Sequence, residues 1–110
     1  FFENYEDVVD ILKKNISNCN FENKTNVIIK DIFLDSALKF PSDSFEIIFL
    51  DPPFQKKISG LLDEIIKLNL LKKGGIIIIH RHKKEIEKLT KSFNILQEKY
   101  YGNSKIIFGN

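Results

Sequence analysis

Four consecutive residues, Asp51-Pro52-Pro53-Phe54, carry the clearest chemical signal in the sequence. The two prolines fix φ and remove two backbone N–H donors, so this turn offers only acceptors: the Asp51 carboxylate and carbonyls such as that of Pro52. Phe54 adds an aromatic face on which a base can stack, worth about 1–3 kcal/mol. The four residues therefore indicate a pocket for a planar group that bears an amino nitrogen, such as a nucleobase or an amide. The alternative is that the prolines only end a strand and that Phe54 packs in the core.

The elements that must position this turn can be predicted from hydrophobic periodicity. Helices or a short helical turn are expected over residues 5–17, 35–40, 58–71 and 83–91. Asn4 is the expected cap of the first of these helices. Gly74 and Gly75 follow the third segment, where they would allow a tight reversal into the next strand.

Short apolar segments rich in β-branched residues predict the strands. They cover residues 1–3, 26–30, 45–50, 76–80, 93–98 and 105–108. Because strands alternate with helices and are apolar throughout, we expect an α/β fold with helices on both faces of a doubly wound, mostly parallel sheet. Only a turn at Gly102 and Asn103 joins the last two strands, so these should form an antiparallel hairpin at one edge.

The predicted strands end on side chains that could form a site. The residues at the carboxyl ends of these strands are Glu3, Asp31, Asp51 and His80. Ligands of an open α/β sheet bind outside the carboxyl ends of its strands, so these residues are the first candidates. The three acids could bind a metal ion, or could equally accept hydrogen bonds from sugar hydroxyls and base amino groups. No Cys/His cluster has zinc spacing, and no metal site is predicted.

Length and composition limit the class of protein. The 110 residues are 43% apolar and 29% charged, which predicts one globular domain over residues 1–110 rather than a disordered chain. No apolar run approaches the roughly 20 residues of a membrane span, and a single cysteine, Cys19, cannot form an internal disulfide. We expect a cytoplasmic monomer without a membrane partner. The absence of Met predicts a further segment upstream of these residues.

Charge is distributed unevenly along the chain. Residues 1–50 contain 5 Lys against 9 Asp and Glu, for a net charge of −4, whereas residues 51–110 contain 12 Lys and Arg against 6 Asp and Glu, for +6. The basic half could dock a polyanion at one end of the molecule, or its lysines could simply be solvated on helix surfaces.

Asp51 to Phe54, directly after an apolar strand, resemble the (Asp/Asn)-Pro-Pro-(Phe/Tyr) motif of S-adenosylmethionine-dependent amino methyltransferases. Within that group, the spacing and the ending at residues 98–108, Glu-Lys-Tyr-Tyr-Gly-Asn-Ser-Lys-Ile-Ile-Phe, resemble the RsmD-type enzymes, which methylate the exocyclic 2-amino group of a guanine in small-subunit (16S) ribosomal RNA. The resemblance covers essentially all 110 residues and implies a Rossmann-like class I methyltransferase fold. It also implies S-adenosylmethionine as the cofactor, and 16S ribosomal RNA or a small-subunit assembly intermediate as the partner.

The same resemblance implies where the cofactor binds. Glu3 would bind the ribose hydroxyls, and Asp31, with Ile32 beside it, would contact the adenine. Glu3 could instead be a charge that stabilises the start of a helix, and Asp31 an ordinary strand-end cap.

For the substrate, the resemblance implies a catalytic site at Asp51, Pro52, Pro53 and Phe54, with Asp51 also next to the cofactor. The Asp51 carboxylate and the Pro52 carbonyl would accept hydrogen bonds from the guanine amino group, while Phe54 would stack on the base. RNA phosphates would meet basic residues that otherwise are only solvated charges: Lys56, Lys57, Arg81, Lys83 and Lys84. We interpret His80 as structural.

The sequence departs from this family at its start. The family's first strand and the Gly-rich loop that follows it, which wraps the methionine part of the cofactor, have no counterpart here. Without that central strand, a gap in the sheet is expected. Two other functions stay open: an amino methyltransferase acting on DNA, another RNA base or a protein glutamine, and a non-catalytic RNA-binding module with a methyltransferase-like sheet.

Overall fold

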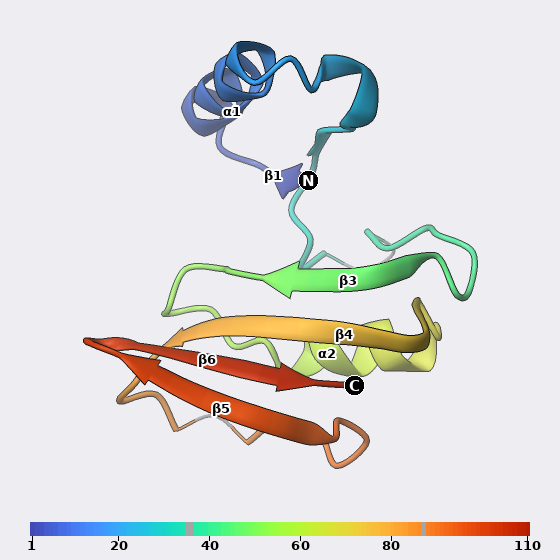
Figure 1. Cartoon of the computed structure of the whole chain (residues 1–110), viewed down its shortest axis with the longest axis vertical. Helices are drawn as coiled ribbons and strands as arrows, with labels where there is room; N and C mark the ends of the chain where they lie inside the picture. The colour runs from blue at the N-terminus through green and yellow to red at the C-terminus, as the bar shows by residue number, and fades with distance from the viewer. Residues whose placement is uncertain (35–36, 87) are drawn as a thin grey trace. The chain divides into compact units, whose positions relative to one another are not determined.

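The computed structural model describes residues 1–34, 37–86 and 88–110 (Figure 1). The chain divides into two compact units, Phe1–Lys39 and Phe40–Asn110. Its described strands form two separate sheets, one of two strands in the first unit and one of four strands in the second. The described strands therefore do not join into one sheet, in agreement with the gap expected from the sequence.

In the first unit, β1 (Phe2–Glu3) pairs in parallel with β2 (Ile28–Ile29). The segment between them contains helix α1 (Glu6–Asn18) and the short 3₁₀ helix η1 (Glu22–Lys24). The first predicted strand and helix are confirmed, whereas the strand predicted at 26–30 is shorter. Of the helical turn predicted over 35–40, residues 35 and 36 lie outside the described part of the chain, and residues 37–40 have no regular structure.

The second unit is a four-stranded sheet with a helix against it. In chain order its elements are β3 (Phe45–Leu50), α2 (Ser59–Lys67), β4 (Leu71–His82), β5 (Ile95–Tyr101) and β6 (Ser104–Gly109). The strand order is β3-β4-β6-β5; β3 and β4 are parallel, and β6 is antiparallel to both its neighbours. β3, β4 and β5 therefore run in one direction. The predicted mostly parallel sheet with an antiparallel hairpin at its edge is confirmed.

Each of the two α-helices in the described part of the chain is followed by an asparagine, rather than a glycine, with positive φ. Asn20 follows α1 and Asn69 follows α2, with φ of 57° and 51°. After α2, the N–H groups of Asn69 and Leu70 donate to the carbonyls of Ile66 and Ile65, which satisfies the last turn. The prediction that this helix continues to residue 71 is wrong because Asn69 already reverses the chain. Among the described residues, no helix has the length and hydropathy needed to cross a membrane.

Gly74 and Gly75 lie inside β4, so the reversal predicted at them is wrong. Gly74 has φ 79°, and the pairing register of β3 against β4 shifts beside it, between Phe45 and Ile47. A Cβ on Gly75 would lie 2.8 Å from the Glu46 carbonyl oxygen. Glycine is required here because the two strands approach closely at an irregular point of the ladder.

The helix predicted over residues 83–91 is wrong, since the described residues of this segment contain no helix. One of the apolar side chains that suggested it, Ile86, is fully exposed. The segment is attached to the hairpin by other bonds: the Lys83 N–H donates to the Asn103 carbonyl, and Lys105 Nζ donates to the Glu85 carbonyl. These tertiary hydrogen bonds outweigh a weak local helix propensity.

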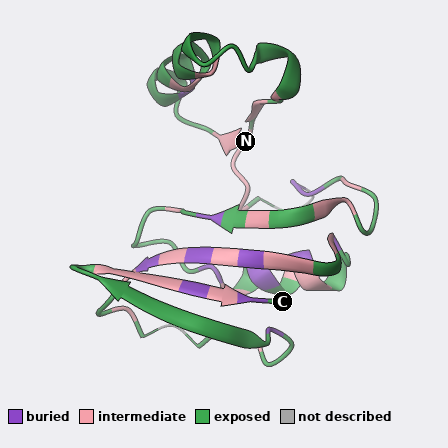
Figure 2. Ribbon diagram, viewed as in Figure 1, coloured by how far each residue is buried: buried purple, intermediate pink, exposed green. Residues whose placement is uncertain are grey.

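The core of the second unit lies between α2 and one face of the sheet, and β4 contributes much of it (Figure 2). Its large, fully buried side chains are Ile58, Leu62, Leu70, Ile77 and Ile79. Side chains alternate across a strand, so Ile77 and Ile79 of β4 both enter this core. Because each such side chain contributes about 1.5–3 kcal/mol on burial, the layer between α2 and β4 largely determines the stability of the unit.

We predict that Leu62→Ala lowers the free energy of unfolding by about 2–5 kcal/mol, because it leaves a cavity in this layer. The matched control is Leu68→Ala at the end of the same helix, where the side chain is 37% exposed and the loss should be under about 1 kcal/mol. Urea denaturation of the two variants measures the difference. Equal losses would contradict this description of the core.

Candidate functional site

Asp51 to Phe54 directly follow β3, as predicted, and begin a loop before α2. β3 and β4 are parallel with Leu50 opposite Ile79, so Asp51 leaves the sheet beside His80. The Asp51 side chain is 51% exposed and Phe54 is 38% exposed. Both are therefore open to a ligand at the carboxyl end of β3. Residues 51–56 are termed the motif loop below.

His80 connects the Asp51 side chain to β6. Its Nδ1 lies 2.7 Å from Asp51 Oδ1, and its Nε2 lies 2.8 Å from Ser104 Oγ. The imidazole is thus held between two hydrogen-bonding partners from opposite sides of β4. The sequence analysis interpreted His80 as structural and did not select Ser104. The signal that could have paired His80 with Asp51 was that both lie at the carboxyl ends of strands predicted to be parallel neighbours.

Arg81 holds the backbone of the motif loop. Its side chain is only 4% exposed, and Nη2 donates to the carbonyls of Phe54 and Lys56, each at 2.9 Å. Nη1 approaches the Pro53 carbonyl at 3.5 Å, and Nη2 forms an ion pair with Glu85 at 2.6 Å. The sequence analysis expected Arg81 to contact phosphate. In the structure its guanidinium faces the protein, and its role is to fix the loop.

The Phe54 ring lies against two imidazoles of β4. The His80 ring is 5.5 Å from it, centroid to centroid, at an interplanar angle of 78°, and the His82 ring is 5.7 Å from it at 62°. Both contacts are edge-to-face, an arrangement that favours aromatic pairs. Phe54 is therefore held in place while more than a third of its surface stays accessible.

In the first unit, the two acids predicted to bind the cofactor each hold a turn of backbone. Glu3 Oε1 accepts hydrogen bonds from the N–H groups of Asn4 and Tyr5, at 2.8 and 2.9 Å. Tyr5 is the N-cap of α1, so the cap predicted at Asn4 is wrong. Asp31 Oδ1 accepts a hydrogen bond from the Phe33 N–H at 2.9 Å. These contacts are those of a helix-start charge and a strand-end cap, the alternatives considered from the sequence.

Glu3 and Asp31 nevertheless fit part of a nucleoside cofactor. Glu3 lies opposite Ile29 in the parallel ladder, so the two acids follow neighbouring strand ends. Each uses only one carboxylate oxygen in the contacts above, and an acceptor is what ribose hydroxyls and an adenine amino group need. Ile32 beside Asp31 is half-buried. These two acceptors suit the ribose and adenine of S-adenosylmethionine. The sequence contains no Gly-rich loop for the methionine end.

A groove of about 390 Å³ opens beside Phe54. Its lining is aromatic, basic and in part apolar, and comprises Phe54, Gln55, Lys57, Ser59, Arg81, Glu85, Ile86 and Lys88. Lys57 and Lys88 are exposed, so they give its wall a positive charge. Lys88 was not selected from the sequence. The other predicted RNA contacts, Lys56, Lys83 and Lys84, are exposed but do not line the groove.

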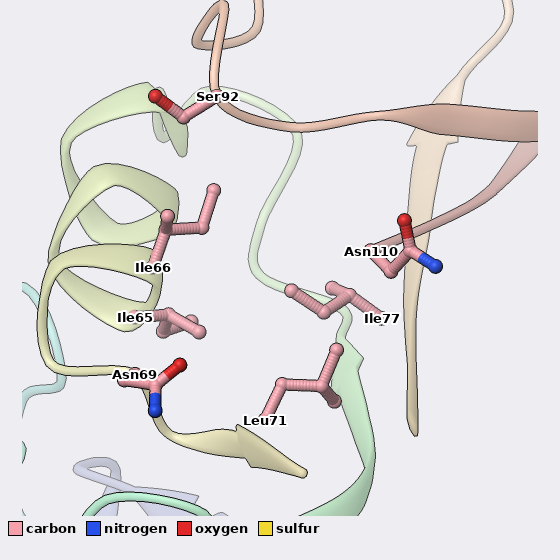
Figure 3. A pocket seen from close by; sticks show the side chains of 7 residues that line it. All are labelled: Ile65, Ile66, Asn69, Leu71, Ile77, Ser92 and Asn110. Carbon is pink, nitrogen blue, oxygen red and sulfur yellow. The ribbon is translucent and has the colours of Figure 1, made fainter. Parts of the chain in front are cut away.

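A smaller hollow, of about 150 Å³, lies between α2 and the start of β4 (Figure 3). Side chains of Ile65, Leu71 and Ile77 point toward it, and no ionisable residue lines it. It is at the opposite end of β4 from His80, so it offers no chemistry to the motif loop. Across the described ranges, no three His, Cys, Asp or Glu residues gather in a way that could hold a metal ion.

This sheet topology, with a Pro-Pro turn and an aromatic residue at a strand end, defines a Rossmann-like methyltransferase fold that is truncated. Among solved structures, a candidate methylase of Haemophilus influenzae matches with a TM-score of 0.76 and 25% identity, over 99% of this chain and 69% of that one. A conserved hypothetical protein of Streptococcus pyogenes matches with a TM-score of 0.81 and 23% identity, over 99% of this chain and 69% of that one. A candidate methyltransferase of Escherichia coli matches with a TM-score of 0.77 and 18% identity, over 98% of this chain and 60% of that one.

The chain belongs to the family described as conserved hypothetical protein 95, whose model matches residues 1–110. It is also similar to an uncharacterized methylase of Rickettsia prowazekii (strain Madrid E), with 33% identity over 84 residues. That alignment covers 76% of this chain but only 36% of the relative, so the chain spans about a third of the length of that curated protein.

We predict that Arg81→Lys loosens the motif loop, because an ammonium cannot reach the several carbonyls that the guanidinium fork holds. Trypsin should then cleave after Lys56 and Lys57 about 10-fold faster, which corresponds to the loss of one or two hydrogen bonds in local opening. Glu85→Gln is the control, since it removes the ion pair and keeps the carbonyl contacts. Mass spectrometry of timed digests measures both; unchanged cleavage in Arg81→Lys would show that Arg81 does not hold the loop.

Proposed function

We propose that this chain is part of an S-adenosylmethionine-dependent methyltransferase that acts on the exocyclic 2-amino group of a guanine in small-subunit (16S) ribosomal RNA. The motif loop carries the proposal, because it sets an exposed carboxylate beside an accessible aromatic ring at a strand end. The methylase relatives support methyl transfer in general. The choice of guanine and of ribosomal RNA rests on the resemblance of Asp51 to Phe54 and of the chain's ending to the RsmD-type enzymes.

The motif loop offers the two acceptors that an amino group with two N–H donors requires. Asp51 keeps one carboxylate oxygen for the substrate while the other faces His80. Arg81 engages the carbonyls of Pro53, Phe54 and Lys56, which lie further along the loop than Pro52. The lone pair of an exocyclic amino nitrogen is conjugated with the ring. Acceptors that draw the nitrogen toward tetrahedral geometry make this lone pair available for attack on a methyl group.

S-adenosylmethionine, when bound, supplies the electrophilic methyl group. In the first unit, Glu3 would accept hydrogen bonds from the ribose hydroxyls and Asp31 from the adenine amino group, with Ile32 against the base. After transfer, the methylated nitrogen must lose one proton. The half-exposed Asp51 carboxylate lies in contact with solvent, so that proton can pass to water.

The surroundings of Phe54 favour a nucleic acid as the substrate. A guanine within a duplex cannot reach a strand-end turn, so the target base must lie in a loop or be flipped out. Phe54 would stack on that base, and the groove beside it carries Lys57 and Lys88 where a neighbouring phosphate would pass. Lys56, Lys83 and Lys84 would add exposed positive charge around this path.

We predict that Asp51→Ala reduces methyl transfer to small-subunit RNA by at least about 100-fold, because it removes an acceptor placed at the reacting nitrogen. Asp63→Ala, on the exposed face of α2, should leave transfer unchanged. Transfer of a labelled methyl group, followed by nuclease digestion and nucleoside analysis, measures the rate and identifies the methylated atom. Label on DNA, on another base or on a protein glutamine would replace the proposed substrate. RNA binding without any transfer would favour a non-catalytic module.

We predict that Lys57→Gln with Lys88→Gln weakens RNA binding and lowers the slope of log Kd against log salt by about 1.5, since each phosphate contact contributes about 0.7–0.9. Lys13→Gln with Lys14→Gln, two exposed residues of α1, is the charge-matched control and should leave the slope unchanged. Fluorescence anisotropy at several salt concentrations measures both. If the two double variants behaved alike, the groove would not be the path of the RNA.

A further inference from the structure

We propose that His80 is a positioning residue for the amino-group acceptor, and that Ser104 completes the hydrogen bonding of the His80 ring from the side of β6. This inference rests on the function proposed above. It assigns a role to two residues that the motif does not include. The observation behind it is the continuous chain from Asp51 Oδ1 through both nitrogens of the His80 ring to Ser104 Oγ, with contacts of 2.7 and 2.8 Å.

The chemistry of the three groups determines where the protons lie. An ionised carboxylate can only accept, so the Nδ1 that faces Asp51 must carry the hydrogen and donate it. In the neutral imidazole, Nε2 is then the acceptor, and the Ser104 hydroxyl donates to it. The Ser104 hydroxyl can donate or accept, so it adapts to the tautomer that Asp51 requires and satisfies the second nitrogen of the ring.

The arrangement restricts the Asp51 side chain to one orientation. Asp51 is half exposed and lies at the end of a strand, where an unrestrained carboxylate would rotate freely. His80 belongs to β4 and Ser104 to β6. These two strands stay paired up to the end of β4, where His80 lies opposite Ile106 and His82 opposite Ser104. The imidazole is thus supported by two strands. It occupies one carboxylate oxygen and leaves the other at a defined place for the substrate.

The same ring also supports the stacking face. The His80 imidazole meets the Phe54 ring edge-to-face at 5.5 Å. One side chain therefore sets the position of both the acceptor and the aromatic surface that would hold the base. An error of about 1 Å in such a placement can reduce a rate by about 100-fold.

Two variants of His80 separate the two contacts. The amide nitrogen of His80→Asn can take the place of Nδ1 and keep the bond to Asp51, whereas the longer His80→Gln places its amide near Nε2 and keeps only the bond to Ser104. We expect kcat for RNA methylation to be at least about 10-fold lower in His80→Gln than in His80→Asn, because both variants lose the ring edge against Phe54 and only His80→Gln loses the bond to Asp51. Thermal unfolding checks that the two are folded alike. Equal kcat values in the two folded variants would overturn the proposal.

A second measurement does not depend on catalysis. In the full chain, a proton–nitrogen correlation spectrum of the imidazoles should show His80 as the Nδ1–H tautomer. Asp51→Leu should shift it toward the Nε2–H form, whereas Ser104→Ala, which leaves Asp51 in place, should keep the Nδ1–H form. An Nε2–H tautomer in the wild type would overturn the positioning role. If no RNA were methylated by the wild type while the tautomer was as expected, the proposed function would fail and the arrangement of the three residues would stand.

Discussion

Two consecutive prolines remove two N–H donors from the motif loop, so the internal bond from the Lys56 N–H to the Pro53 carbonyl must be supplemented by contacts from outside. The end of β4 supplies them. Arg81 binds the carbonyls of the motif loop, and a buried guanidinium in turn needs such acceptors to offset its desolvation. The loop and the arginine therefore stabilise each other, and the exposed chemistry at Asp51 depends on a contact that lies beneath it.

That contact is possible only because β4 is long and correctly registered. Asn69 ends α2 early enough for the strand to begin at Leu71, and Gly75 lets β4 lie close to β3 through the irregular part of the ladder. With this register Asp51, directly after β3, lies beside His80 of β4. A shift of one residue would turn His80 to the opposite face of the sheet and Arg81 toward the place that His80 now occupies.

Periodicity was sufficient to predict the elements that carry their own pattern: the first helix, the strand before the motif, and the hairpin at the edge of the sheet. Periodicity was insufficient where contacts with residues distant in the sequence determine the local structure. With the strand predicted to end at residue 80, Arg81 looks like a surface charge. Because β4 continues to residue 82, Arg81 and His80 point to opposite faces of the sheet. The segment after β4 looked helical because its bonds to the hairpin cannot be seen in its own residues. Whether Glu3 and Asp31 meet a cofactor or only cap backbone could not be read from charge and position alone.

The two imidazoles that flank Phe54 give this position a spectroscopic use. The chain contains no tryptophan, so Phe54→Trp would introduce a single indole fluorophore into the site itself. Its emission would be set by the edges of His80 and His82 in the free protein, and a purine stacked on the open face would quench it. Entry of a base into the site could then be timed separately from the chemical step, in a stopped-flow experiment that requires no label on the nucleic acid.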